Sequence, residues 1–418
     1  MVESPMLSQN KQPQWHRNMM ALWVGNFATG AGASMSLPFL PLFISTMGHF
    51  PKWELSLYAG MAFAATFLSQ AIVSPLWGKL ADRTGRKPML LRAAIGMTVT
   101  SLITGLSTNV WMLITLRLIQ GGFSGYINNA YALVASEVPR EKSGQTMGTL
   151  TTGAVGGQLV GPIFGGFIAG FLGYRVPFFI FSALMLMAAL VTFFGVKETF
   201  TPLPKQSKAA QQSAFAGVKH LRVVWAMIIS SMLIQAATNS VNPIISLFVR
   251  ELMHNEGNVA FASGVVAAMP GIATLLAASR LGALGDHIGP RRVLIGGLIL
   301  SGGLFAPMTF VTSVVVLGGL RFFVGIADAA LLPVTQTVMT LDTPPSAISR
   351  IFSYNQSFQA IGSVLGPMLA SAVAGLWDYR FVFLMTALLV VINLIVVIWA
   401  YHTDGGDATH KPTITSAK

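Results

Sequence analysis

One carboxylate lies inside a long apolar segment, where an acidic side chain could bind and release a proton. Asp328 follows Arg321 by seven residues, a spacing that places both side chains on one face of a helix. Apolar surroundings favour the protonated carboxyl and a nearby cation favours the ionised one, so a carboxyl that alternates between them exchanges protons. We predict that Asp328 is a proton-responsive group with Arg117 and Arg321 as its electrostatic partners. A permanent ion pair with either arginine is the alternative.

Polar residues in another apolar segment also follow the helical period. Four of them, spaced by three, four and four residues, share one helix face: Arg117, Gln120, Ser124 and Asn128. An arginine keeps its proton in proteins and costs roughly 2.5–3.5 kcal/mol at the centre of a membrane helix. This face is therefore expected to meet a cavity or an acidic partner, with a fixed structural ion pair as the alternative.

Further amide and phenol side chains occur inside apolar segments, where they could contact a small-molecule substrate or hydrogen-bond neighbouring helices. These candidate cavity residues are Gln235, Asn239, Asn242, Tyr354 and Gln356. No constellation typical of an enzyme accompanies them, since the chain has no cysteine, scattered histidines and no phosphate-binding lysine loop. We expect no cofactor, no metal site and no enzymatic activity.

The segments that carry these residues are too apolar for a water-soluble protein. Of the 418 residues, 53% are hydrophobic and 10% are charged, whereas a soluble domain has about 25% charged residues. A helix needs roughly 20 apolar residues to cross the hydrocarbon core of a bilayer. Twelve such runs predict an all-α integral membrane protein, with spans near 19–44, 57–77, 89–107, 110–134, 145–171, 176–196, 223–249, 260–280, 293–311, 314–340, 350–375 and 379–401.

The chain divides into two related halves, because matching residues recur at an offset of 204 or 205 positions. Examples are Gly78 and Gly282, Arg117 and Arg321, Pro38 and Pro243, and Tyr174-Arg175 and Tyr379-Arg380. Six spans per half give both copies one orientation, so we expect parallel repeats related by an axis along the membrane normal. The expected units are a tail at 1–18, a six-helix bundle at 19–196, a linker at 197–222, a second bundle at 223–401 and a tail at 402–418.

The net charge of +12 is distributed by membrane side. Most lysines and arginines fall in the tails, the linker and the loops on the side of both termini. The exceptions are Lys52, Arg175, Arg250 and Arg380 on the other side, and Arg117 and Arg321 within helices. The positive-inside rule makes the crowded side cytoplasmic. The basic charge therefore indicates a partner bilayer rather than a nucleic acid.

Three motifs resemble signatures of the major facilitator superfamily. A glycine-bracketed basic loop resembles its helix 2–3 signature and has a degenerate copy in the second half. The segment from Arg117 to Gly122 resembles the helix 4 signature, and a glycine-rich part of the fifth span resembles a motif of drug/proton antiporters. The loop comprises Gly78, Asp82, Arg83, Gly85, Arg86 and Lys87, its copy Gly282, Asp286 and Gly289, and the fifth-span motif Gly157, Gly161, Pro162, Gly165 and Gly166.

The resemblance implies a role for these motifs. The two loops would act as cytoplasmic latches, with Asp82 meeting the eleventh span, which begins near Ser349, in the outward-facing state. A purely topological cluster of positive charge is the alternative. The fifth-span motif would form a hinge or seal between the halves, and simple close packing fits equally well.

Segments around Asp328 and Tyr354 resemble the MdtG-type multidrug efflux proteins, although the first span lacks the acidic residue that many drug/proton antiporters carry. The resemblance implies a secondary active transporter that exports drugs or toxic compounds in exchange for protons by alternating access. It would work as a monomer in the bacterial plasma (inner) membrane, on small-molecule substrates and protons. A proton-coupled carrier of a sugar, organic acid or other metabolite is the alternative, and a non-transporting receptor or scaffold is the third hypothesis.

Overall fold

The structure is a computed structural model that describes residues 13–139, 142–200, 218 and 220–403. This part of the chain is built from helices and contains no strand, which confirms the predicted all-α class. The elements are α1 (Gln14–Ser36), η1 (Leu37–Phe39), α2 (Leu40–Ile44), α3 (Lys52–Thr84), α4 (Arg86–Gly105), α5 (Val110–Phe123), α6 (Tyr126–Glu137), α7 (Ser143–Leu172), α8 (Val176–Gly195), α9 (Leu221–Ser240), α10 (Ile245–Leu252), α11 (Val259–Ile288), α12 (Pro290–Met308), α13 (Val314–Asp342), α14 (Pro345–Leu376) and α15 (Tyr379–Thr403).

Eleven helical segments within the described residues are long and apolar enough to cross a membrane. Two of them are composite, since α1, η1 and α2 form one and α9 and α10 form another. The breaks fall at Pro38 and Pro243, which lack the N–H that a continuous helix needs. These prolines occupy equivalent positions in the repeat, so the two halves bend at the same place.

The expected fourth span, 110–134, is two helices rather than one. Ser124 is extended and Gly125 has a φ of 107°, a conformation that favours glycine, so α5 ends before α6 begins. Each helix alone is too short to count as a span. The predicted single polar face through Arg117, Gln120, Ser124 and Asn128 is therefore wrong, because the break interrupts the helical period between Gln120 and Asn128.

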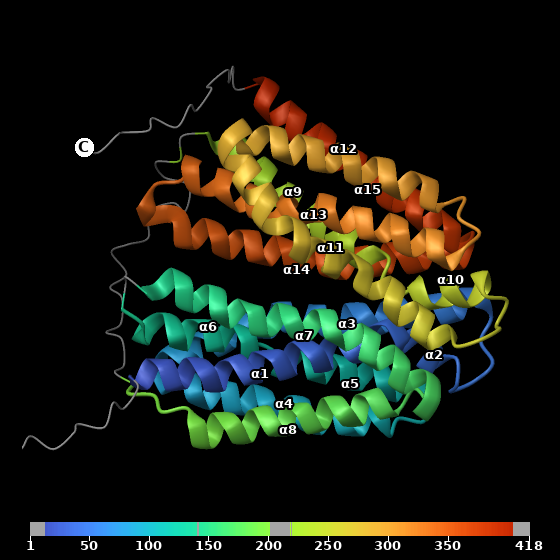
Figure 1. The fold of residues 1–418 in the computed structure, drawn as a ribbon, viewed down its shortest axis with the longest axis horizontal. Helices are drawn as coiled ribbons and strands as arrows, with labels where there is room; N and C mark the ends of the chain where they lie inside the picture. Colours follow the sequence, from blue (N-terminus) through green and yellow to red (C-terminus); the bar gives the residue numbers. More distant parts are fainter. Residues whose placement is uncertain (1–12, 140–141, 201–217, 219, 404–418) are drawn as a thin grey trace, which may run out of the picture.

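The helices form two bundles, α1–α8 and α9–α15, that lie side by side (Figure 1). In the first bundle α1 packs on α7 and α8, and in the second α14 packs on α9 and α11 on α13. The main contacts between bundles join α3 to α14 and α7 to α11. The repeat exchanges these two pairings, as expected of an axis running between the bundles.

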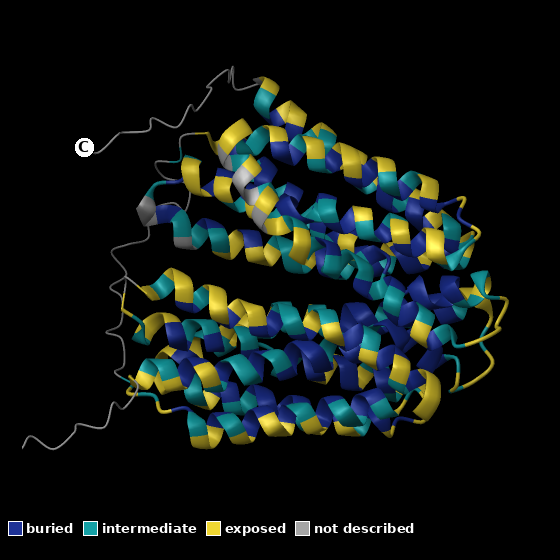
Figure 2. Cartoon of the chain, viewed as in Figure 1, coloured by how far each residue is buried: buried dark blue, intermediate teal, exposed yellow. Residues whose placement is uncertain are grey.

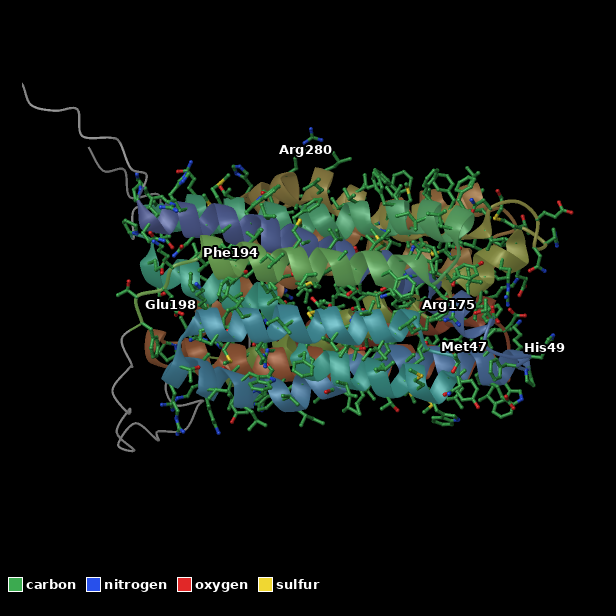
Figure 3. The ribbon with its side chains drawn as sticks, turned by 90° about the horizontal axis from the view of Figure 1, so that it is seen from below. Met47, His49, Arg175, Phe194, Glu198 and Arg280 are labelled. Atoms are coloured by element: carbon green, nitrogen blue, oxygen red, sulfur yellow. The ribbon has the colours of Figure 1, made fainter. Side chains whose placement is uncertain are left out.

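The bundles meet mainly at one end. Their ribbons touch near α2 and α10 and diverge towards the end where α1 begins and α8 ends (Figure 1). Buried residues are dense where they touch and sparser along the diverging faces (Figure 2). Glu198 lies at the diverging end, whereas Met47, His49 and Arg175 lie at the opposite end (Figure 3).

The duplication is visible in packing as well as in sequence. The guanidinium of Arg175 lies 5.6 Å from the ring centroid of Phe43, and that of Arg380 lies 5.5 Å from the ring of Phe248. Each arginine also donates to a main-chain carbonyl at the C-terminal end of a neighbouring helix, α4 and α12 respectively. Arg380 follows Arg175 by 205 residues, and Phe248 follows Phe43 by 205 residues, so one local arrangement occurs twice.

The glycine-rich motif of the fifth span lies within α7 and serves two packing surfaces. Gly157, Gly161 and Gly165 face α1 so closely that a Cβ atom would collide with its main chain. Gly166 and the carbonyl of Pro162 instead meet α11 of the other bundle. Small residues allow such close approach of membrane helices. The motif thus makes a close-packed contact within one bundle and a contact between bundles, while its action as a hinge stays a prediction.

Candidate functional site

A cavity of about 660 Å³ lies at the diverging end of the bundles. Its walls come from α3, α4, α5, α6 and α7, together with Gln356 on α14 of the second bundle. Among the predicted cavity residues, Ser124, Asn128 and Gln356 line it. Arg86 and Arg92 also line it, and no acidic residue does among those described. The cavity is therefore polar, positively charged and shared by both halves.

Arg92 and Trp77 hold open the break between α5 and α6. The Arg92 guanidinium donates to the carbonyl of Ser124 at 2.9 Å, and the Trp77 indole donates to that of Gly122 at 2.7 Å. The two side chains also stack, with the guanidinium carbon 3.9 Å from the ring centroid. Non-helical main chain at membrane depth needs such partners. The spacing of the sequence does not indicate this role of Arg92, because its carbonyl partners lie 31 and 32 residues away.

Arg117 and Gln120 lie inside the first bundle and do not line the cavity. Nη1 of Arg117 donates to Oε1 of Gln120 at 2.9 Å, and Nε2 of Gln120 donates to Oγ of Ser101 at 2.9 Å. Nε of Arg117 has no hydrogen-bond partner among the described residues. The side chain is 4% exposed, so Arg117 is a buried cation surrounded by neutral dipoles.

The amide residues of the seventh span connect helices of the second bundle. Nδ2 of Asn239 donates to the carbonyl of Gln235 at 3.0 Å, and Nδ2 of Asn242 donates to Oδ1 of Asn239 at 3.2 Å. Asn239 and Gln235 also reach Oγ of Ser363 on α14, at 3.4 and 3.5 Å. Tyr354 is 44% exposed. In this conformation these amides link α9 to α14, and their contact with a substrate stays a prediction.

Asp328 lies within the second bundle, on α13, and is half-buried. Oγ of Ser301, on α12, donates to its Oδ1 at 3.4 Å. Arg321 is close enough to interact electrostatically with the carboxylate, but its Nε donates to the carbonyl of Val266 at 3.2 Å. None of the ion pairs among the described residues includes Asp328. Of the two predicted arginine partners, Arg321 is thus near Asp328, and Arg117 is in the other bundle.

The basic loop forms the expected sharp turn. Gly85 ends α3 and begins α4 with a φ of 95°. Asp82 and Arg86 form an ion pair across this turn at 2.9 Å, on a partly exposed surface. In the second copy, Gly289 has a φ of 89°. Gly282 and Asp286 belong to α11, but their surroundings are not among those that the structure describes.

Glu198, which follows α8 at the end of the first bundle, binds this loop. Its carboxylate accepts the main-chain N–H groups of Arg86 and Lys87, each at 2.7 Å, at the start of α4. The Lys87 ammonium in turn donates to the carbonyls of Phe193 and Val196 at the end of α8. An anion at a helix N-terminus and a cation at a C-terminus are both favourable. Sequence reasoning missed Glu198, since 112 residues separate it from Arg86.

Replacing Gly85 by alanine is expected to destabilise the first bundle. With a φ of 95° and a ψ of 170°, Gly85 has a backbone conformation that is essentially restricted to glycine and costs a residue with a Cβ atom about 1–3 kcal/mol. That Cβ atom would also lie 2.8 Å from Oε2 of Glu198. Thermal unfolding in detergent should show a lower midpoint for Gly85→Ala. Gly144→Ala is the matched control, since Gly144 has space around it within α7 and no positive φ. Equal midpoints for both variants would contradict this account of the turn.

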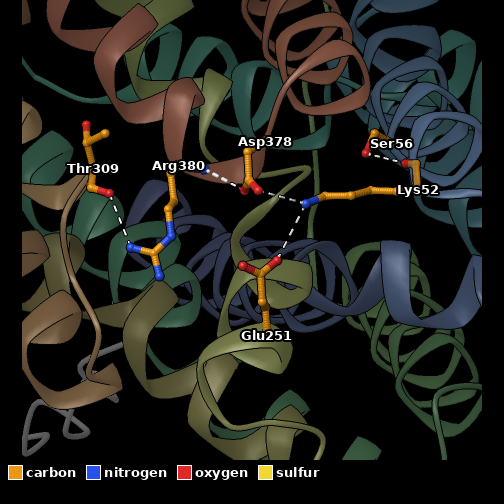
Figure 4. A network of polar contacts seen from close by, with 6 residues as sticks. All are labelled: Lys52, Ser56, Glu251, Thr309, Asp378 and Arg380. Carbon is orange, nitrogen blue, oxygen red and sulfur yellow. Dashed lines mark hydrogen bonds and ion pairs between the residues drawn. The ribbon is translucent and has the colours of Figure 1, made fainter.

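A cluster at the opposite end joins the two bundles. Nζ of Lys52 lies 3.2 Å from Oδ2 of Asp378 and 3.6 Å from Oε2 of Glu251 (Figure 4). It also lies 4.2 Å from the ring centroid of Tyr379. We call these four residues the Lys52 cluster. Lys52 belongs to α3 of the first bundle, and the other three residues belong to the second bundle. The ion pairs of Lys52 with Glu251 and with Asp378 therefore both join the bundles.

Tyr174 and Arg250 lie at the same end. Burial raises the pKa of the Tyr174 phenol, and the nearby Arg250 guanidinium of the other bundle acts in the opposite direction. Nη1 of Arg250 also reaches Oγ of Ser45 in the first bundle at 3.5 Å. Polar contacts therefore accompany the Lys52 cluster where the bundles touch.

Comparison with known sequences agrees with this architecture. The sequence model of the Major Facilitator Superfamily matches residues 22–278 and, in a second match, 227–417. The chain is 44% identical over 390 residues to the multidrug resistance protein MdtG of Klebsiella pneumoniae (strain 342), covering 93% of this chain and 95% of that protein. It is 45% identical over 381 residues to MdtG of Salmonella heidelberg (strain SL476), covering 91% and 94%.

Solved structures share the fold at low sequence identity. A bacterial homologue of the human lysosomal transporter Spinster, inward-facing and unoccupied, has a TM-score of 0.75 at 16% identity and covers 94% of this chain and 98% of its own. The nucleoside transporter NupG has a TM-score of 0.75 at 15% identity and covers 92% of this chain and 99% of its own.

Apolar spans arranged as two repeated bundles beside a shared polar cavity define a multi-pass membrane transporter. The protein belongs to the major facilitator superfamily, as its motifs indicated. It therefore acts on a small-molecule substrate within a membrane and is not an enzyme.

Proposed function

We propose that this protein is a secondary active transporter that exports drugs or toxic compounds in exchange for protons. The near-full-length similarity to the MdtG multidrug resistance proteins carries the proposal. We further propose that it works as a monomer in the bacterial plasma (inner) membrane with both termini cytoplasmic, because the basic loops and tails then obey the positive-inside rule.

The arrangement of the bundles supports transport by alternating access. The cavity lies at the end of the basic loops, and the Lys52 cluster joins the bundles at the other end. In our proposal the bundles 19–196 and 223–401, connected by the linker 197–222, rock about the central contacts. Opening the outer end would separate the Lys52 cluster. Closing the inner end would bring Asp82 of the basic loop towards the start of α14.

Proton coupling is assigned to Asp328. It is the acidic residue that lies in the middle of a span, and its neighbours supply both influences that a proton-exchanging carboxyl needs. Apolar helices favour the protonated form, and Arg321 and the Ser301 hydroxyl favour the ionised form. The relative strength of these influences changes when the bundle moves, which would link proton exchange to transport.

A proton-coupled carrier of a metabolite, such as an organic acid, is the second candidate. The observation that favours it is the charge of the cavity, which Arg86 and Arg92 line without an acidic residue among those described. Such a cavity suits an anionic substrate. The same charge is compatible with export of anionic drugs, so only transport measurements separate the two candidates.

Drug-dependent proton movement in membrane vesicles tests the proposed function. Everted vesicles from cells expressing the protein should acidify under respiration and release protons when an exported compound is added, as reported by a pH-sensitive dye. The same cells should resist several unrelated toxic compounds more than cells without the protein. Proton release with organic acids or sugars, and none with any toxic compound, would favour the metabolite carrier.

A further inference from the structure

A second, much smaller cavity lies inside the bundle α9–α15, beside Asp328. Its volume of about 10 Å³ is enclosed by α9, α12, α13 and α15, and this is about the space that one water molecule needs. Leu298, Phe305 and Leu331 form part of the apolar wall. Three polar residues line it together with Asp328, namely Thr238 on α9, Ser301 on α12 and Asn393 on α15.

Asn393 brings a buried acceptor to this cavity. The residue is 1% exposed, and its Nδ2 donates to the carbonyl of Ser230 on α9 at 3.5 Å. That contact leaves Oδ1 free to accept, and no donor reaches Oδ1 among the described residues. Buried acceptors in proteins nearly always have a donor, either from the protein or from water. An unpartnered amide oxygen in a cavity of this size is a feature typical of a water-binding site.

We propose that this cavity binds one water molecule, which donates to Oδ1 of Asn393 and to the carboxylate of Asp328. Asn393 is then a positioning residue that acts on Asp328 through the water. The hydroxyl of Ser301 donates to the same carboxylate directly. This inference rests on the proposed proton-coupled function and names the ligand that completes the proton site.

The water has a defined effect on proton exchange at Asp328. A hydrogen bond donated to a carboxylate stabilises its ionised form, so losing the water makes the carboxyl retain its proton to higher pH. Asp328 is the only titratable residue among those lining the cavity from α9, α12, α13 and α15. Arg321 is the charged residue that acts on it, from the same helix. Asn393 therefore influences Asp328 without adding a charge.

Infrared titration of the full-length protein in nanodiscs tests the inference. The carbonyl stretch of protonated Asp328 is identified by its absence in Asp328→Asn. In Asn393→Leu, which removes the acceptor at similar volume, the titration midpoint should rise by about one pH unit, a tenfold change in proton affinity. A water O–H band that shifts in H₂¹⁸O should accompany ionised Asp328 and disappear in Asn393→Leu.

Further variants of Asn393 and a control variant complete the experiment. Asn393→Val is the second apolar variant if leucine prevents insertion, and Asn393→Ser, which keeps an acceptor, should restore the midpoint. Ser230→Ala is the matched control, because it removes a buried hydroxyl of α9 that has no hydrogen-bond partner among the described residues and does not line the cavity. It should leave the midpoint unchanged.

An unchanged midpoint in both apolar variants, or the absence of any ¹⁸O-sensitive band, would overturn the water site. A midpoint that changes when sodium replaces choline in the buffer would also overturn it, in favour of a bound cation. Failure of the proposed function has a different signature. Asp328→Asn would then still couple transport to protons, whatever the infrared result.

Discussion

Asp328→Asn is expected to abolish proton-driven export while the protein still inserts into the membrane. Asparagine keeps the size of the side chain and still accepts a hydrogen bond from Ser301, but it binds no proton in the physiological range. The proton gradient then has no ionisable group to act on at that depth. Substrate-induced proton release from everted vesicles should fall to the level of vesicles without the protein. Substrate–substrate exchange, which moves no net proton, should persist.

Glu256→Gln is the matched control for this variant. Glu256 is an exposed acid in the turn between α10 and α11, so removing its charge should leave proton release intact. Full coupling in Asp328→Asn would remove Asp328 from the mechanism. Loss of exchange as well as coupling would assign the residue to substrate binding or to bundle stability instead.

Lys52→Glu is expected to shift the protein towards the conformation open at the outer end. The substitution places three carboxylates where one ammonium now joins two. Each partly exposed pair contributes about 0.2–1 kcal/mol, and like charges at such positions repel by similar amounts. A total of about 1.4 kcal/mol changes the ratio of the two conformations tenfold. The effect is large because this equilibrium involves only a few kcal/mol.

Cysteine labelling at the inner cavity measures this shift. The natural sequence has no cysteine, so Asn128→Cys introduces a single thiol in the cavity wall. Its labelling rate from the cytoplasmic side should fall in Lys52→Glu. The charge swap Lys52→Glu with Glu251→Lys should restore the rate, because a cation again lies between two acids. Equal rates in all three proteins would show that the Lys52 cluster does not hold the outer end closed.

The Lys52 cluster should also make the balance between the two conformations sensitive to ionic strength. Because its three charged side chains are 34–40% exposed, salt screens them. High ionic strength outside the cell should therefore act in the same direction as Lys52→Glu. The close contacts of α3 with α14 and of α7 with α11 do not depend on salt and would set the baseline of this equilibrium.

Much of the fold could be predicted from the sequence. The length of apolar runs sets the number of spans, because a helix is the way for one isolated segment to satisfy its main-chain groups in lipid. The nearly constant offset, which is 204 residues between Arg117 and Arg321 and 205 between Pro38 and Pro243, reveals the duplication directly. The break at Ser124–Gly125 was missed, since a stable break depends on Arg92 and Trp77, which reach it from α4 and α3.

The candidate site was less predictable. Ser124, Asn128 and Gln356 line the inner cavity as expected of them, but Gln120 faces the interior of its own bundle. Helical spacing predicts which residues share one face of a helix, but it does not predict whether that face packs against another helix or lines a cavity.

The sequence by itself determined the class of the protein, its two-fold repeat and the presence of one carboxyl at mid-membrane. These properties follow from composition, periodicity and spacing along the chain, which solvation by lipid makes decisive. Only the tertiary structure decided that Arg321 is the arginine near Asp328, that Glu198 holds the start of α4, and that Asn393 shares a cavity with Asp328. Each of these is a contact between helices far apart in sequence, and the packing of the bundles alone brings them together.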